Sequence, residues 1–302
     1  MATQAPTLSV VVNTKNSAAT LKACLNSVKS IADEIIVMDM HSDDRTVEIA
    51  KNFRAKVFYH PDVGYVEPAR NAAIGKATGD WVLILDSDET IPPSLATEIR
   101  ETLILDPKTD AYFLPRKNII FGKWVKTGWW PDYVLRLFKP NLVVWSNEIH
   151  STPQISGTAE RLPESEKLAI VHENYQTVDQ FIDRAQRYGR IVATNQHENK
   201  KTTPDPLKNF FSEFLRRYFQ WDGQNDGAHG YYLSVLQGLT AVLESAYLWE
   251  KKEFSSAKKQ VKISGLLAEM AREARYWELT NKVNASSGIL RWYWKGRRWL
   301  SR

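Results

Sequence analysis

Two aspartates with a single residue between them stand at the end of an apolar run. Asp86 and Asp88 follow the segment WVLIL at 81–85. Because like charges held this close repel each other, the pair is costly unless a cation lies between them. A divalent ion held by one or two carboxylates and by substrate phosphates neutralises charge on a departing diphosphate. The pair therefore predicts Mg²⁺ or Mn²⁺ here; in the alternative, Asp88 caps the next helix and Asp86 is solvated.

Polar residues also end two earlier apolar runs. LSVVV continues into Thr14 and Asn16, and EIIVM ends at Asp39, with His41 two residues further on. We interpret Asp39 as a hydrogen-bond acceptor for the ribose or base of a nucleoside, although a turn or helix cap also uses aspartate. A histidine in a polar loop, such as His41, is more often solvated than a ligand. Arg70 begins a helix, where it faces a phosphate or pairs with an acid of the SDDR loop.

A sheet must position these polar residues. The apolar runs predict strands at 8–12, 34–38, 56–59 and 81–85, and helical patterns lie at 20–29, 46–53 and 68–77. Runs this continuously apolar suit strands covered on both faces, and their alternation with helices predicts an α/β domain with a mostly parallel sheet. Ligands bind beyond the carboxyl ends of such strands, where the polar residues lie.

The rest of the chain changes character twice. From 110 to 172 short mixed strands alternate with loops rich in Gly, Pro and Trp, and beyond about residue 176 the pattern is helical. We therefore expect a catalytic domain at 1–175, with a donor half at 1–90 and an acceptor half at 91–175. A helical C-terminal region at 176–302 follows it.

The net charge of +5 is concentrated at the end of the chain. Between residues 285 and 302 there are five cations and no acid, interleaved with Ile, Leu, Trp and Tyr from residue 289 onward. Basic residues attract an anionic surface, and indole rings favour the headgroup zone of a bilayer. The segment 289–302 therefore predicts reversible binding to the inner face of a membrane. The alternative is a helix packed on the protein with its arginines solvated.

Three segments together resemble family-2 glycosyltransferases with the GT-A fold. They are LSVVVNTKN, EIIVMDMHSDDRT and PARNAAIGKATGDWVLILDSDE, in this order and spacing. WWPDYVLRLFKP, VHENYQTVDQFIDRAQRYGRIVA and WDGQNDGAHGYY further resemble the lipopolysaccharide-core β-1,4-glucosyltransferase group. The resemblance implies transfer of a hexose, glucose being the commonest, from a UDP-sugar to a glycan or lipid-linked acceptor such as a lipopolysaccharide core.

The resemblance also implies roles for single residues. Thr14 and Asp39 would contact the nucleoside, and Asp86 and Asp88 would form the Asp-x-Asp motif, with Asp88 as the main metal ligand. The nucleotide-binding set expected from these motifs is Thr14, Asn16, Asp39, His41, Arg70 and Asp86.

The family inverts the anomeric centre, so an acidic base is expected to activate the acceptor hydroxyl. We place this base first at Glu148 in NEIHS, which follows the RLFKP strand as the base segment of the family does, and second at Asp132 in WWPDY. Related proteins commonly show His-Glu in the former segment, whereas His150 is followed here by Ser151. Either acid is a plain surface residue in the alternative.

Trp129 and Trp130 stand just before the second candidate base. Aromatic faces suit the apolar CH faces of sugars, so we expect these residues to bind the acceptor. Ordinary core packing is the alternative use of both rings.

Composition excludes several classes of protein. The chain of 302 residues has 43% hydrophobic and 25% charged residues, as in ordinary globular proteins, and its one cysteine excludes a disulfide framework. We expect a cytoplasmic protein, because neither a signal peptide nor 18 consecutive apolar residues occur. NTKNSAATL lacks the glycines of a dinucleotide-binding loop, and no nucleic-acid motif accompanies the basic tail. A nucleotidyltransferase, or a carbohydrate-binding or scaffold protein without activity, are the alternatives to a glycosyltransferase.

Overall fold

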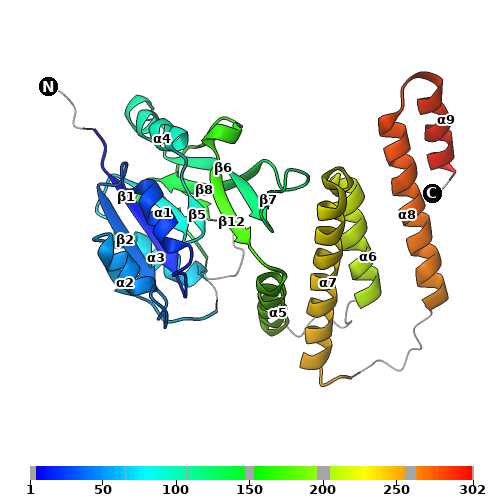
Figure 1. The fold of residues 1–302 in the computed structure, drawn as a ribbon, viewed down its shortest axis with the longest axis horizontal. Coiled ribbons are helices and arrows are strands. Elements are labelled where there is room, and N and C mark those ends of the chain that lie inside the picture. The colour runs from blue at the N-terminus through cyan, green and yellow to red at the C-terminus, as the bar shows by residue number, and fades with distance from the viewer. Residues whose placement is uncertain are drawn as a thin grey trace. The chain divides into compact units, whose positions relative to one another are not determined.

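The structure is a computed structural model. It describes residues 5–64, 66–106, 108–146, 153–195, 205–255 and 263–300. The chain divides into two compact units, residues 1–176 and 177–302. The first unit is built around a sheet, and the described part of the second consists of helices (Figure 1).

The first unit contains a ten-stranded sheet in the order β3-β2-β1-β4-β8-β6-β12-β5, with β7 and β11 paired to β6. Its strands are β1 (Leu8–Thr14), β2 (Glu34–Asp39), β3 (Lys56–Tyr59), β4 (Trp81–Asp86), β5 (Glu89–Thr90), β6 (Ala111–Ile120), β7 (Lys123–Trp124), β8 (Asp132–Phe138), β11 (Ala159–Arg161) and β12 (Ile170–Tyr175). The four strands from β3 to β4 are parallel, and β8 is antiparallel to both of its neighbours. A separate antiparallel pair joins β9 (Val143–Val144) and β10 (Gln154–Ile155). The predicted fold class, an α/β domain with a mostly parallel central sheet followed by helices, is confirmed.

Helices cover both faces of this sheet. They are α1 (Leu21–Val28), α2 (Thr46–Asn52), α3 (Glu67–Ile74) and α4 (Pro93–Leu105). Every residue of β1 is buried, because alternate side chains enter two different cores. Val10 packs in the core that α1 and α4 close, whereas Val11 packs in the core that α3 closes. The apolar run is therefore continuous because both faces of β1 are covered, as the sequence predicted.

The pairing of the strands brings the predicted polar residues together. Asn13 at the end of β1 lies beside Asp86 on β4, and Thr14 lies beside Asp39 on β2. Strands β1, β2 and β4 each extend one or two residues beyond the apolar runs, so these polar residues are parts of strands rather than of loops. The carboxyl edge of the sheet is thus lined by side chains of fixed position.

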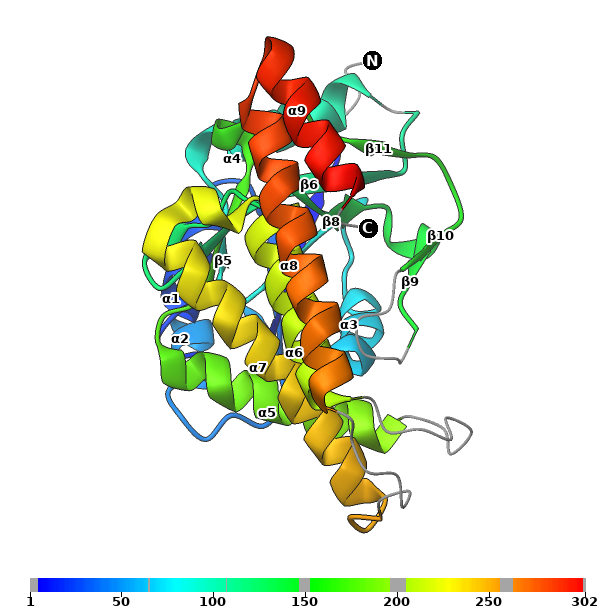
Figure 2. The same ribbon diagram turned by 90° about the vertical axis from the view of Figure 1, so that its right-hand side faces the viewer.

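The second unit contains α5 (Val178–Asn195), α6 (Pro206–Leu215), α7 (Gly227–Lys251), α8 (Ile263–Ala285) and α9 (Gly288–Trp299). Helix α7 packs closely against α6 at Gly238. A Cβ at this position would lie only 2.8 Å from the ring of Phe210, so the close approach requires glycine. Helix α9 folds back along α8 as a hairpin (Figure 2). Among the helices of the described ranges, none is both long enough and apolar enough to cross a membrane.

Candidate active site

Two arginines hold the carboxylate of Asp86 at the end of β4. Arg70 from α3 donates to Oδ1 at 2.9 Å, and Arg136 from β8 donates to Oδ2 at 2.5 Å. Burial alone would raise the pKa of the Asp86 carboxyl, but the charges of Arg136 and Arg70 hold that pKa well below its usual range. Two guanidinium groups therefore balance the charge for which the sequence predicted a metal ion. Arg70 pairs with Asp86 rather than with the acids of the SDDR loop.

Glu89 is a second buried carboxylate, which the sequence analysis did not assign. It has no exposed surface, and its Oε1 accepts hydrogen bonds from Arg116 at 2.9 Å and Arg136 at 2.7 Å. Burial lowers the pKa of the Arg136 guanidinium, but the carboxylates of Asp86 and Glu89 raise it well above its usual range. The sequence signal for this network was the run of acids in DSDE, which also suits a surface loop.

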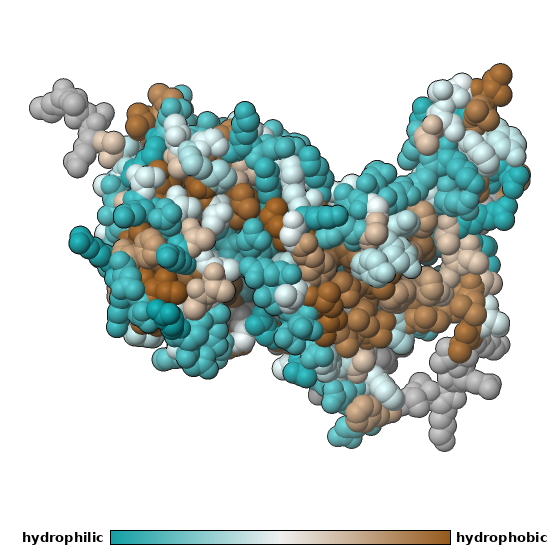
Figure 3. All heavy atoms as spheres, viewed as in Figure 1, coloured by the Kyte–Doolittle hydropathy of each residue, from teal (hydrophilic) through white to brown (hydrophobic). Residues whose placement is uncertain are grey.

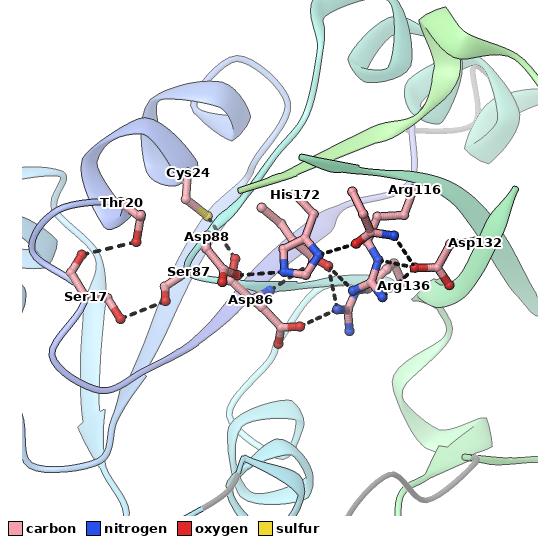
Figure 4. Close-up of polar contacts among 12 residues, drawn as sticks. Ser17, Thr20, Cys24, Asp86, Ser87, Asp88, Arg116, Asp132, Arg136 and His172 are labelled. Atoms are coloured by element: carbon pink, nitrogen blue, oxygen red, sulfur yellow. Dashed lines mark hydrogen bonds and ion pairs between the residues drawn. The ribbon is translucent and has the colours of Figure 1, made fainter. Parts of the chain in front are cut away.

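Asp88 faces a histidine from β12. His172 Nε2 lies 3.5 Å from Asp88 Oδ1 (Figure 4). Its Nδ1 lies 2.7 Å from Oδ1 of the fully buried Asn118 on β6. The amide nitrogen of Asn118 donates to Asp132, so the amide oxygen must accept the hydrogen bond from His172. His172 therefore carries a hydrogen on Nδ1, and Nε2 faces Asp88.

Asp132 is held at the beginning of β8. Its Oδ2 accepts hydrogen bonds from Arg116 at 2.9 and 2.7 Å and from Asn118 at 2.9 Å. The antiparallel register places Asp132 directly beside Arg116, and the side chain keeps 29% of its surface exposed. All three hydrogen bonds are accepted by Oδ2, and they fix the orientation of the carboxylate. Oδ1 accepts no hydrogen bond within the described part of the chain.

The donor set at Asp88 suits a divalent ion that the substrate helps to bind. Asp88 offers a carboxylate oxygen and His172 offers a ring nitrogen, and magnesium-type sites often use so few protein ligands when phosphates complete them. Within the described ranges no three His, Cys, Asp or Glu side chains form a cluster that would hold a metal alone. Asp88 is not a helix cap, because α4 begins after Pro92.

Buried polar groups without partners lie at the nucleoside end of the site. Asn13 and Thr14 are 2% and 1% exposed, yet the amide of Asn13 and the hydroxyl of Thr14 find no hydrogen-bond partner in the described structure. Such groups cost roughly 1–3 kcal/mol each when they remain unpaired. Since Asn13 lies beside Asp86 on the adjoining strand, its amide is suited to a polar ligand at that edge of the sheet.

The other predicted nucleotide contacts take part in the loop after β2. Both oxygens of Asp39 accept hydrogen bonds from Ser42, at 2.9 Å from its amide and 2.6 Å from its hydroxyl. This is the turn geometry that the sequence left as the alternative. Asn16 accepts from the amide of Asp43 at 3.0 Å, and the ring of His41 stacks on a tyrosine, Tyr59, at 5.8 Å. Asn16 in the loop after β1 and His41 in the loop after β2 both have positive φ, so each shapes its own loop.

The chain that leads towards Glu148 is attached to α3. Asn71 donates to the carbonyl of Trp145 at 2.7 Å and accepts from its amide at 3.0 Å, and Arg70 lies 5.8 Å from the centre of the Trp145 ring. Glu148, with residues 147–152, lies outside the described residues.

The predicted acceptor tryptophans are half-buried beside Asp132. The ring of Trp130 packs edge-to-face on Trp124 at 5.3 Å, and the Nζ of Lys126 lies 4.1 Å from the centre of the Trp124 ring. Trp129 is close in sequence and similarly half-buried. Trp130 thus takes part in local packing, which was the alternative reading of this pair.

Comparison with known proteins identifies the family that the chain resembles. Residues 9–150 match the profile of Glycosyl transferase family 2. An uncharacterized glycosyltransferase of Rickettsia bellii is 28% identical over 267 residues, covering 80% of this chain and 86% of that protein. The crystal structure of S. aureus TarS aligns with a TM-score of 0.44 and 17% identity over 76% of this chain, but this chain covers only 55% of TarS. Glucosyl-3-phosphoglycerate synthase from Mycobacterium tuberculosis, in complex with Mn²⁺ and UDP-glucose, aligns with a TM-score of 0.39 and 17% identity, over 63% of this chain and 77% of that one.

Proposed function

Since the chain belongs to glycosyl transferase family 2 through residues 9–150, we propose that it is an inverting, metal-dependent enzyme that uses a UDP-sugar donor. One observation carries this proposal. A continuous series of contacts joins Asp88 through His172 and Asn118 to Asp132. It connects a carboxylate suited to a diphosphate-bound ion with a carboxylate suited to removing a proton, and glycosyl transfer with inversion needs both.

The nucleoside of the donor binds at the ends of β1, β2 and β4. Uracil presents an N–H between two carbonyl groups, and the unpaired amide of Asn13 offers both a donor and an acceptor to such an edge. Thr14, Asp39 and Arg70 border the same region. Asn16 supports it by accepting a hydrogen bond from the loop after β2, and His41 by shaping that loop.

Asp88 and His172 would hold the divalent ion, which would supply positive charge to the departing diphosphate. Both oxygens of Asp86 already accept from arginines, so Asp86 contributes by orienting Arg70 and Arg136 at the phosphate side of the site. An imidazole nitrogen is a softer ligand than the oxygens that Mg²⁺ prefers, and therefore favours Mn²⁺.

Asp132 is the general base of the proposal. Arg116 and Asn118 fix its Oδ2 and leave Oδ1 to accept the proton of the acceptor hydroxyl. Glu148 is the competing candidate. Trp129 and Trp130 stand beside Asp132 and bind the acceptor sugar. The resemblance to lipopolysaccharide-core enzymes suggests glucose as the sugar and a lipid-linked glycan of the cell envelope as the acceptor.

Product analysis with purified full-length protein tests the proposal. The protein is incubated with UDP-, GDP- and CMP-sugars, with Mn²⁺ or with EDTA, and the released nucleotide is identified. We expect slow release of UDP from UDP-glucose that EDTA abolishes. Release of diphosphate from UTP and a sugar phosphate would instead identify a nucleotidyltransferase. Preferred binding of GDP or CMP over UDP in isothermal titration would contradict uracil as the nucleobase of the donor.

A further inference from the structure

Helix α9 exposes an apolar face. Six large side chains of α9 and its C-cap residue are 51–88% exposed. Apart from Leu290, these are Ile289, Trp292, Tyr293, Trp299 and Leu300. At 100° per residue they fall within an arc of about 120°, with Gly296 near its centre. Hydrophobic atoms at the turn into α9 are visible on the molecular surface at the tip of the α8–α9 hairpin (Figure 3).

The opposite side of α9 holds the hairpin together. Trp294 is half-buried, and the Nζ of Lys282 on α8 lies 4.9 Å from the centre of its ring. Arg298 reaches back in the same direction, with its guanidinium carbon 5.8 Å from the centre of the Tyr276 ring. The face that carries Trp292 and Trp299 is therefore additional to the face that packs on α8.

Cations border this apolar face. Lys295 lies over the ring of Trp292 at 4.7 Å, and Arg297 donates to the hydroxyl of Tyr293 at 3.2 Å. Arg291 and Arg298 are the other two cations of α9, and the helix contains no acidic residue. Aromatic rings with one polar edge, flanked by basic side chains, match the boundary between headgroups and acyl chains of an anionic bilayer.

We propose that α9 binds reversibly to a membrane surface rich in anionic lipid, with Trp292 and Trp299 inserted at the headgroup level. The helix has 12 residues, about 18 Å, and so lies in the surface rather than across it. A second copy of the chain is a poor occupant, because it would bring two acid-free basic helices together. This inference is independent of the proposed catalytic function.

Vesicle flotation of the full-length protein tests the inference. We expect the protein to float with phosphatidylcholine vesicles that contain phosphatidylglycerol, to stay behind with phosphatidylcholine alone, and to be released by high salt. Trp292→Ser combined with Trp299→Ser should reduce the bound fraction about tenfold or more. Lys295→Glu combined with Arg297→Glu should do the same.

Matched controls separate this surface from general effects of the substitutions. Trp249→Ser removes an exposed indole from α7, and Lys22→Glu with Lys51→Glu makes the same charge change on the first unit. Both should leave flotation unchanged, and circular dichroism should show all variants folded. Equal flotation of the α9 variants and the wild type would overturn the inference. So would a native dimer in sedimentation that the Trp292/Trp299 variant converts to a monomer, since a second copy would then occupy the face.

Discussion

Nδ1 of His172 on β12 and Oδ1 of Asn118 on β6 are 2.7 Å apart, and the two residues are register partners in parallel strands. Both are buried, and Asn118 has no exposed surface. A histidine that binds a metal commonly donates its other ring hydrogen to a fixed acceptor, which sets the tautomer and the orientation of the ring. Asn118 provides such an acceptor and at the same time donates to Asp132.

The first prediction concerns this positioning. Asn118→Ala should weaken Mn²⁺ binding in the presence of UDP by about 10–100-fold, because His172 loses the partner that orients it. Isothermal titration of Mn²⁺ into the protein–UDP complex measures the change. His172→Gln should have an effect at least as large, whereas Asn26→Ala, on the exposed side of α1, should have none. Unchanged affinity in both site variants would remove His172 from the metal site.

The second prediction contrasts two aspartates on one short segment. Asp88→Asn should abolish metal-dependent transfer and leave the free energy of unfolding nearly unchanged, because the Asp88 side chain is 23% exposed and asparagine keeps its shape. Activity assays with and without Mn²⁺ and urea unfolding of the same sample measure both effects. Full activity of this variant would contradict the assignment of Asp88.

Asp86→Asn is the matched variant and should behave differently. It removes an anion from Arg136, whose side chain is only 4% exposed, so the fold should lose about 3 kcal/mol of stability as well as activity. Urea unfolding that shows equal stability for the two asparagine variants would mean that Glu89 alone suffices for Arg136.

The third prediction decides between the two candidate bases. Asp132→Asn should reduce kcat by about 10²–10⁴-fold while the affinity for UDP stays close to that of the wild type. The variant keeps the shape of the side chain that Arg116 and Asn118 contact. Glu148→Gln, made in parallel, should retain most of the activity. The reverse pattern would transfer the role of base to Glu148.

The sequence predicted the sheet well because the pattern that marks each strand lies within a few neighbouring residues. Runs such as WVLIL are buried on both faces, and the polar residue after each run lies at the carboxyl edge of the sheet. Asp86 and Arg70 were both recognised as site residues, but their pairing was not, because a residue on α3 meets one on β4 only through the tertiary fold.

His172 and Asn118 show what the sequence did not reveal. Each stands in a strand of mixed composition, and 54 residues separate them. Only the parallel pairing of β6 with β12 makes them neighbours, and this pairing leaves no pattern in either segment. Glu89 was assigned no role from the sequence for a related reason, since its partners Arg116 and Arg136 come from strands far along the chain.

The last prediction concerns Glu34 at the beginning of β2 and the stability of the fold towards acid. Its carboxylate accepts hydrogen bonds from Ser9, from the amide and hydroxyl of Thr78 at 2.6 and 2.9 Å, and from Lys56 at 2.7 Å. Burial alone would raise the pKa of Glu34, but these partners lower it from its usual 4.5 to about 2. The unfolded chain therefore binds a proton more readily than the folded chain does, and Glu34 stabilises the fold above pH 4.5 by up to about 3 kcal/mol.

This contribution is lost as the pH falls from about 4.5 towards about 2, the pKa of the folded state. Glu34→Gln should thus destabilise the protein clearly at neutral pH, and by less than half as much near pH 3, because the wild type has by then lost most of the same stabilisation. Urea unfolding of both proteins at the two pH values measures the difference. Glu101→Gln, at an exposed position of α4, should show little effect at either pH. A destabilisation by Glu34→Gln that does not change with pH would show that the loss of a hydrogen-bond acceptor oxygen, rather than of the charge, destabilises this corner of the sheet.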